Sequence, residues 1–300
     1  MENYKKVNLI LWIILFLNIL VAAIKIILGL SINSNSLLAD GFHGVTDSSS
    51  NIISIIGIKF ASKPADKKHP YGHQKYETIA SMFIGLLLFY ITIQIVLNAI
   101  NYTVSDKVYS LNGIYILIGT LVINILISIY EYKLGKKYNS EVLVADSIHT
   151  RSDILISFGV IVSIILIRFG VSPIIDPIFS VIIAVIILIS CIQILKSTIS
   201  ILVDSKVIDE KKIKEIVYNT NKDIKDVHNV RSRGKNNHIY IDMHILVNPK
   251  LSVKSTHDLS HEIQRNLRND IGENVELIAH IEPFEGDVRL HETLHDKISY

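Results

Sequence analysis

Long apolar stretches alternate with short polar ones over the first two thirds of the chain. Each is long enough to supply the roughly 20 residues that a membrane-spanning helix needs. We predict spanning helices near residues 8–31, 36–60, 77–101, 111–131, 142–168 and 174–199. The first stretch is too long for the apolar core of a signal peptide and has no small-residue cleavage pattern after it, so we expect an uncleaved first helix.

After about residue 205 the pattern becomes that of a small soluble α/β domain. It predicts helices near 209–220 and 254–270, and strands near 226–232, 237–247 and 275–282. Alternation along the last two strands separates two faces. One face is apolar, with Ile239, Ile241, Met243, Ile245, Val247, Leu277, Ala279 and Ile281, and the other carries His238, Tyr240, Asp242, His244, His280 and Glu282.

Composition supports this division, because 49% hydrophobic and 19% charged residues are typical of a multi-span membrane protein with a soluble part. We therefore expect a transmembrane domain over 1–204, a soluble domain over 205–286 and a tail over 287–300. Basic residues predict the orientation, since they are enriched in cytoplasmic loops. They are Lys5, Lys6, Lys63, Lys67, Lys68, Lys75, Lys133, Lys136 and Lys137. Both termini and the soluble domain are thus predicted to be cytoplasmic, and the protein to lie in the cell membrane.

Several kinds of chemistry are excluded by what the sequence lacks. Cys191 is the only cysteine, so neither an intramolecular disulfide nor a thiolate cluster can form. There is no G-x-x-x-x-G-K-S/T phosphate loop, which argues against a nucleotide as partner or energy source. The formal charge of +2 gives no support for nucleic-acid binding, because topology already explains the lysines.

One polar motif occurs twice inside apolar stretches. A-D-x-x-H-x-x-x-D spans residues 39–47 and again 145–153. On a helix, His43 and Asp47 lie one turn apart on one face, as do His149 and Asp153. Ionisable side chains at membrane depth are costly and rare unless they pair, ligate or line a water-filled path. Two matched pairs therefore indicate a functional site, although buried polar contacts between helices are the structural alternative.

Depth along the helices tests whether the two pairs can meet. Asp47 lies about 16 Å from the outer end of the second span, and Asp153 about 18 Å from the cytoplasmic end of the fifth, at 1.5 Å per residue. Because these depths sum to roughly the hydrocarbon thickness of about 30 Å, the pairs reach nearly the same level. Two imidazoles and two carboxylates suit tetrahedral coordination of a divalent ion whose charge the carboxylates cancel.

Other membrane classes fit less well. An intramembrane metalloprotease needs His-Glu-x-x-His, and a four-helix di-iron oxidase needs Glu-x-x-His motifs, and the membrane pairs contain neither. The absence of such motifs favours a carrier over an enzyme. A metal-gated channel or sensor stays open as an alternative, because the same site could gate rather than carry.

Six spans, paired H-x-x-x-D motifs and a C-terminal soluble domain together resemble the cation diffusion facilitator family of divalent-metal/proton antiporters. The resemblance runs from the first span to about Gly286. It implies a homodimer with an all-α six-helix membrane bundle and a cytoplasmic, metallochaperone-like (ferredoxin-like, αββαβ) domain. It further implies a second metal site in the loop after the second span, formed by Asp66, His69 and His73.

The resemblance also assigns residues outside the membrane pairs. A charge interlock at the dimer centre would join Lys75 to Asp204. The cytoplasmic domain would bind metal through His228, His244, His257, His280 and Glu282, the last being a Glu where Asp is usual in the family. For the loop and the soluble domain, the alternative is ordinary surface histidines, and we expect that for His261 and the tail residues His291 and His295.

The ligand set bears on the ion and the mechanism. Two His and two carboxylates in a tetrahedral array favour Zn2+, with Co2+ or Cd2+ acceptable, whereas Mn2+ prefers more and harder oxygen ligands. His43 is similar to the zinc-selective type, but the loop and flanking sequence are also similar to members that move Mn2+ or Fe2+. Such a site binds either the ion or protons, so metal release and proton uptake are one exchange.

Overall fold

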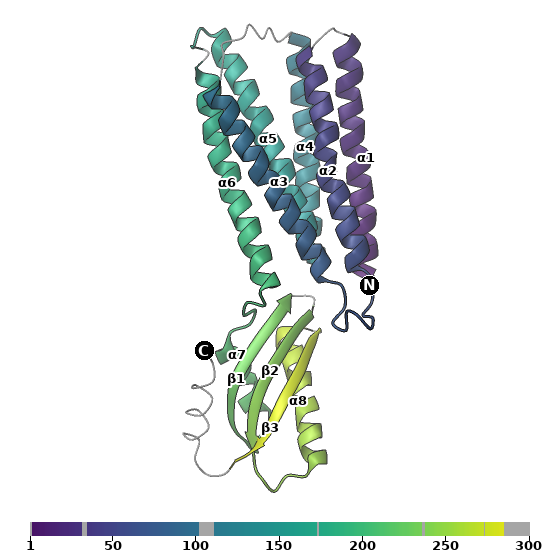
Figure 1. Cartoon of the computed structure of the whole chain (residues 1–300), viewed down its shortest axis with the longest axis vertical. Helices are drawn as coiled ribbons and strands as arrows, with labels where there is room; N and C mark the ends of the chain where they lie inside the picture. Colours follow the sequence, from purple (N-terminus) through teal and green to yellow (C-terminus); the bar gives the residue numbers. More distant parts are fainter. Residues whose placement is uncertain are drawn as a thin grey trace. The chain divides into compact units, whose positions relative to one another are not determined.

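The computed structural model describes residues 2–31, 35–101, 111–172, 174–235, 238–272 and 274–284 (Figure 1). The chain divides into two compact units, one within residues 1–199 and the other within residues 200–300. Each unit has a hydrophobic core of its own.

The first unit is a bundle of long helices (Figure 1). They are α1 (Glu2–Ser31), α2 (Asn35–Ala61), α3 (Lys75–Ile100), α4 (Leu111–Tyr138), α5 (Glu141–Arg168) and α6 (Ile175–Leu202). Four helices in the described chain are long and apolar enough to cross a membrane, namely α1, α3, α4 and α6. α2 and α5 carry the repeated polar motif, and its Asp, His and Ser residues lower their hydropathy. A helical membrane domain is confirmed, and a count of six spans stays a prediction.

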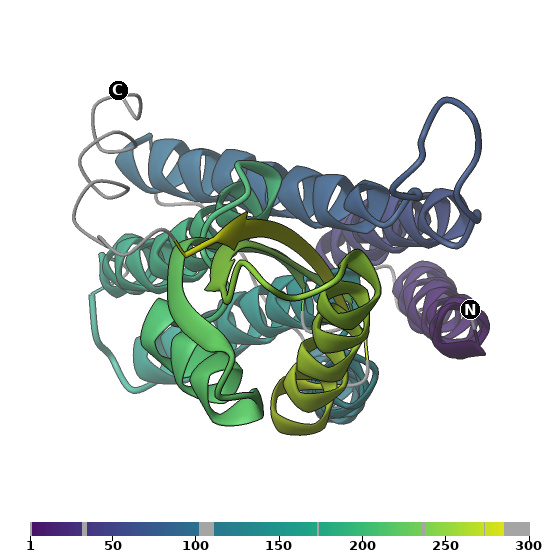
Figure 2. The ribbon, with the colours of Figure 1, turned by 90° about the horizontal axis from the view of Figure 1, so that it is seen from below.

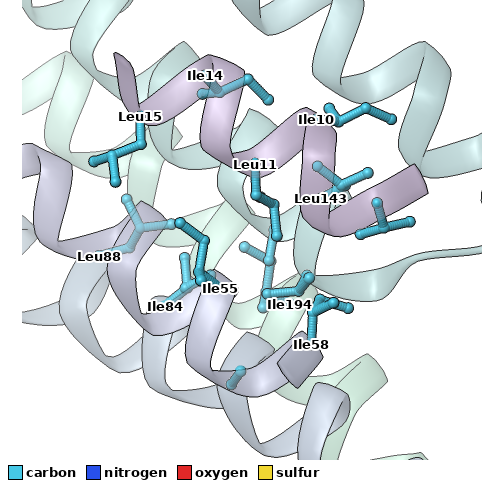
Figure 3. Packing of buried hydrophobic residues seen from close by; sticks show 14 of the residues in the cluster. Ile10, Leu11, Ile14, Leu15, Ile55, Ile58, Ile84, Leu88, Leu143 and Ile194 are labelled. Atoms are coloured by element: carbon cyan, nitrogen blue, oxygen red, sulfur yellow. The ribbon is translucent and has the colours of Figure 1, made fainter. Parts of the chain in front are cut away.

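Aliphatic side chains from all six helices form the core of this bundle, and Figure 3 shows part of it. Leu11 of α1, Ile84 of α3 and Leu143 of α5 are fully buried there. Gly57 of α2 lies so close to Ala80 of α3 that any side chain at position 57 would collide with it. Close packing of this kind fixes α2, which carries one of the two polar motifs, against its neighbours.

The outer surface of the bundle is also apolar. Trp12, Phe16, Leu126 and Ile182 are each about half exposed or more. Large exposed apolar surfaces are rare in water-soluble proteins, and they match the lipid tails that surround a membrane protein.

The second unit has the predicted order of elements. It contains α7 (Glu210–Thr220), β1 (Ile224–Lys235), β2 (His238–Val247), α8 (Val253–Ile271) and β3 (Val275–Pro283). β1 pairs with β2 in antiparallel orientation, and β2 pairs with β3 in parallel, so α8 is the crossover between parallel strands. Asp209 caps the start of α7 and Ser252 that of α8, each accepting a backbone N–H.

The two faces of this sheet differ as the alternation predicts. Ile241, Met243 and Ile245 are at most 1% exposed and pack in the core of the unit. α7 and α8 lie on the same side of the sheet, as Figures 1 and 2 show. The side chains of His228, His244 and Glu282 come together away from that core, on the other face.

Candidate functional site

A cavity inside the helix bundle contains one of the two predicted ligand pairs. His149 and Asp153 of α5 line it, one helical turn apart. His149 is only 2% exposed, so its ring lies inside the bundle. The other lining residues come from α1, α2, α4 and α5, and include Asn18, Lys25, Gly44, Ser50, Asn124 and Thr150.

The second predicted pair belongs to α2, which borders the same cavity. The side chains of His43 and Asp47 lie outside the described residues, although the helix that carries them is described. Gly44, which directly follows His43, lines the cavity. The backbone therefore brings the α2 motif to the cavity that His149 and Asp153 line.

Buried hydrogen bonds tie the two motif helices together. Asp146, the leading Asp of the α5 motif, accepts a hydrogen bond from Ser50 Oγ at 2.9 Å and another from Asn51 Nδ2. Asn51 in turn accepts one from Asn18 of α1 at 2.8 Å. Asp146 is fully buried, and its two partners satisfy a charge that would otherwise be costly at this depth. Asp146 thus fixes α5 against α2 and is not among the residues lining the cavity.

The loop between α2 and α3 brings its three predicted ligands together. One potential ligand atom from each of Asp66, His69 and His73 lies within 4.8 Å of the others. Asp66 Oδ1 is 3.3 Å from His69 Nδ1, and Asp66 Oδ2 is 3.5 Å from His73 Nε2. Ligands about 2.0 Å from tetrahedral zinc lie about 3.3 Å from one another, so small side-chain movements would suffice for binding.

The loop also prepares these groups for binding a cation. The backbone N–H of His69, and after it that of Lys68, holds the pKa of Asp66 below its usual range. His73 Nδ1 lies 3.0 Å from the carbonyl oxygen of Pro64. A ring N–H donated to that carbonyl fixes the tautomer and leaves Nε2 as the metal-facing nitrogen.

On the open face of the soluble unit, three histidines form a row across the sheet. His228 of β1 is paired with His244 of β2, and His244 with His280 of β3. Neighbouring ring centroids are 5.2 Å and 4.8 Å apart. The register of the sheet alone therefore groups three imidazoles that are far apart in the sequence.

Glu282 completes this cluster from the same face of β3. Its Oε1 atom lies 2.7 Å from His244 Nδ1 and 3.6 Å from His280 Nε2, and Oε2 lies 3.6 Å from His228 Nε2. Ligand atoms of His228, His244 and Glu282 all lie within 4.8 Å of one another. Imidazole and carboxylate ligands at this spacing suit a divalent transition-metal ion. The longer Glu side chain thus reaches all three histidines.

A second carboxylate contacts the Nδ1 side of the His228 ring. Asp226 Oδ2 lies 3.1 Å from His228 Nδ1, and Asp226 Oδ1 accepts a hydrogen bond of 2.9 Å from the hydroxyl of Tyr218. Partial burial, followed by this bond to Asp226, raises the pKa of Tyr218. Asp226 therefore orients His228 with Nε2 toward Glu282, as second carboxylates commonly do at metal sites.

Of the remaining predicted residues, one lies on another element, one has a different partner, and two are not described. His257 lies on α8, exposed and outside the His228, His244 and Glu282 group, with its ring 4.5 Å from that of His261. Asp204 forms an ion pair of 3.3 Å with Arg233 inside the soluble unit. Its interlock with Lys75 stays a prediction. The tail residues His291 and His295 lie outside the described residues.

Sequence reasoning missed Asp226, Glu131 and Lys25, and it placed Asp146 in the repeated motif without finding its contact with α2. Asp146, Asp226, Glu131 and Lys25 each act through a contact or cavity that only the folded chain creates. Glu131 is fully buried in α4 and accepts a hydrogen bond of 3.1 Å from Thr150 Oγ1 of α5. Lys25 and Glu131 are charged residues inside or at the edge of apolar stretches, and that position could have identified them. The sequence around Asp226 contains no comparable signal.

Fold and site together define a membrane protein with a His and an Asp lining a cavity inside its bundle and two further His/carboxylate clusters outside it. The family described as "Cation efflux transmembrane domain" matches residues 11–203, and "Cation efflux protein, cytoplasmic domain" matches residues 206–284. The chain therefore belongs to the cation diffusion facilitator family, whose members move divalent metal cations out across membranes.

Individual relatives match along most of the chain, and one solved structure matches over a smaller part of it. A transporter of Methanocaldococcus jannaschii, MJ0449, is 36% identical, covering 86% of this chain and 92% of its own. The manganese efflux system proteins MneP and MneS of Bacillus subtilis are 25% and 24% identical, covering 91% and 89% of this chain and 94% and 92% of theirs. A structure described as that of a candidate zinc transporter, CzrB, covers 26% of this chain and 99% of its own, with 18% identity and a TM-score of 0.23.

Proposed function

We propose that this chain exports a divalent metal ion from the cell in exchange for protons, through a transport site formed by His43, Asp47, His149 and Asp153. The observation that carries the proposal is the cavity lined by His149 and Asp153, on whose border the α2 motif also lies. A buried His and a partly buried Asp that line one cavity, in the helix bundle of a metal-efflux family, would bind the transported ion.

The chemistry of these four ligands couples the two fluxes. Imidazole and carboxylate accept either the metal ion or protons, and each kind of cation displaces the other. Rocking of the helices would expose the cavity to one side of the membrane and then to the other. An inward proton gradient then drives metal outward, and bound nucleotide is not needed.

Zinc is the ion that the ligands favour. Two imidazoles with two carboxylates match the tetrahedral geometry and mixed N/O ligands that Zn2+ accepts, and Co2+ and Cd2+ can occupy similar sites. The two negative charges neutralise the ion, which lowers the cost of holding it away from water.

Manganese is the second candidate, because two relatives covering most of the chain are named manganese efflux proteins. Mn2+ prefers oxygen ligands and higher coordination. The hydroxyl and amide groups of Ser50, Asn18 and Asn124 line the same cavity and would supply such oxygens. A site that recruits them would favour Mn2+ or Fe2+ over Zn2+.

We further propose a homodimer whose soluble domain, from about residue 205 to 286, lies in the cytoplasm with both termini. The His228, His244, His280 and Glu282 cluster would bind metal there, with His257 contributing only across a dimer interface. Metal bound by the soluble domains would draw the two copies together and bias the transport cycle, which is a coupling between distinct sites.

Transport by the purified protein in sealed lipid vesicles tests the proposal. An imposed pH gradient should drive saturable uptake of zinc, manganese, iron, cobalt or cadmium with counterflow of protons, in an order that identifies the ion. Asp47→Asn and Asp153→Asn should abolish it, while Glu215→Gln, a change on exposed α7, should not. Fast flux without proton coupling would instead show a channel, and normal flux in both Asp variants would refute the site.

A further inference from the structure

Lys25 of α1 is a buried cation at the cavity of the proposed transport site. Its side chain is only 6% exposed, although α1 is one of the apolar helices of the membrane unit. It lines the same cavity as His149 and Asp153. A lysine that faced lipid would extend along the outside of the helix toward the membrane surface and would be exposed there. Lys25 instead points into the bundle.

Contacts between α1 and α2 set the level of Lys25 relative to the polar motif. A side chain at Gly44 would meet the Cβ atom of Ala22 at 3.3 Å, and Asn18 donates a hydrogen bond to Asn51 at 2.8 Å. The residue numbers rise along α1 as they fall along α2, so the helices are antiparallel. Lys25 is one turn beyond Ala22, which places it level with the turn of α2 that ends at Gly44.

The charge of this site changes during the proposed cycle. When the metal ion leaves, protons or another cation must balance the charge of the carboxylates that held it. Uncompensated charge at such depth costs several kcal/mol, whereas an ammonium beside a carboxylate neutralises it. A divalent ion and an ammonium compete for the same carboxylate oxygens, since both are cations that need anionic partners.

The geometry points to Lys25 as a tethered cation of the transport site. Its ammonium compensates the site carboxylates after the metal has left, and the next metal ion displaces it. This inference rests on the proposed function and deepens it. Lys25 therefore weakens metal binding, and it speeds the return of the metal-free carrier, because its charge adds to that of the bound protons in balancing the carboxylates.

Two kinds of flux separate this role from a structural one. Net transport requires the metal-free carrier to return, whereas exchange of metal for metal across vesicles uses only the loaded carrier. For Lys25→Gln we expect net transport to fall about tenfold, exchange to stay within about twofold, and the metal dissociation constant to fall about tenfold. Lys25→Arg keeps the positive charge and should retain net transport, and Lys59→Gln, at an exposed lysine on α2, is the matched control.

The measurements use zinc or manganese, whichever ion the wild type moves, with Lys25→Met as a second neutral variant that keeps the stem of the side chain. Equal loss of exchange and net transport, with a lower melting temperature, would show that Lys25 is structural and overturn the inference. Unchanged net transport and affinity in both neutral variants would overturn it as well. A wild type that shows neither flux would refute the proposed function itself, which is a separate result.

Discussion

Asp226 is the residue whose contribution to metal binding is easiest to isolate. It contacts His228 on the nitrogen opposite the one that faces Glu282. Asp226→Asn keeps the size of the side chain but removes the charge that orients and polarises the imidazole. We expect metal affinity of the soluble cluster to fall about tenfold or more. Calorimetry on the wild type and on the variant measures this, and equal affinities would show that Asp226 only anchors Tyr218.

His43 should decide which ion the protein prefers. His43→Asp replaces an imidazole by a hard oxygen ligand that permits higher coordination, so we expect transport of manganese and cadmium to rise relative to zinc. Competition between these ions in vesicle uptake measures the ranking. The same ranking in wild type and variant would mean that His43 does not touch the ion.

The pH dependence of the loop site follows from its three side chains. Backbone N–H groups lower the pKa of Asp66, so its carboxylate stays ionised at pH values at which an ordinary aspartate begins to protonate. Because the folded pKa lies below the unfolded value of about 4, the ionised carboxylate stabilises the loop above that pH, and this stabilisation is lost only as the pH falls through the folded pKa. Acidification should therefore weaken metal binding, because protons compete for the ligands, while the loop stays folded until the pH falls through the lowered pKa of Asp66.

A pH titration of metal binding to the loop uses a variant with His149→Ala and His244→Ala, which removes one ligand from each of the other two candidate sites. Asp66→Asn in the same background removes the anionic ligand and should lower the metal affinity at every pH, while the midpoint of the pH dependence stays where it is in the parent variant. A midpoint that moves in Asp66→Asn would assign the pH dependence to Asp66 instead.

Sequence reasoning found the residues that belong to a repeated motif or to the alternating pattern of a strand. The doubled motif indicated His149 and Asp153, and strand parity placed His244, His280 and Glu282 on one face. Lys25 and the structural role of Asp146 were missed because they depend on contacts between different helices. Nothing in the local sequence of Asp146 says that Ser50 and Asn51 will lie opposite it.

At the scale of the elements, Asp146 is the link that fixes α5 against α2. Asp146→Ala removes the acceptor for two buried hydrogen bonds and leaves Ser50 and Asn51 without it. We expect a loss of about 1–3 kcal/mol of stability per group left unsatisfied. Thermal unfolding in detergent should show a lower midpoint, and transport should fall as well, because the two helices carry the proposed ligands.

Glu215→Gln on the exposed face of α7 is the control for that experiment. Asp146→Asn keeps an acceptor oxygen for one of the two donors, so it should lie between wild type and alanine. Wild-type stability in the alanine variant would show that the packing of α2 on α5 does not need this link.

The observed helices are longer than the apolar stretches that predicted them. α1 begins at Glu2, before the predicted start near residue 8, because Asn3 and Lys5 interrupt the apolar run without interrupting backbone hydrogen bonding. α4 continues to Tyr138, past Glu131, where its apolar run ends. Hydropathy measures the part that suits lipid, and a helix extends beyond it wherever its residues favour helical backbone.

At the scale of the whole molecule, the soluble unit offers the sharpest test of how metal connects the two copies. Its ligands come from three strands that only folding brings together, and it has a core of its own. A fragment from about residue 205 should therefore fold alone and be stabilised by bound metal, because the unfolded chain lacks the assembled site. We expect zinc to raise its melting temperature and to produce a tighter or more compact dimer.

Calorimetry and small-angle scattering on this fragment, with and without zinc, measure both effects. His244→Ala with His280→Ala should abolish them, whereas His238→Ala, on the same strand but paired with Glu276 outside the cluster, should not. His257→Ala separates two arrangements: loss of the dimer effect with binding retained would place His257 at the interface between copies. If the wild-type fragment binds no metal at micromolar concentration, His228, His244 and His280 are ordinary surface histidines without a metal-binding role. Any regulation by metal would then have to come from the loop or the membrane bundle.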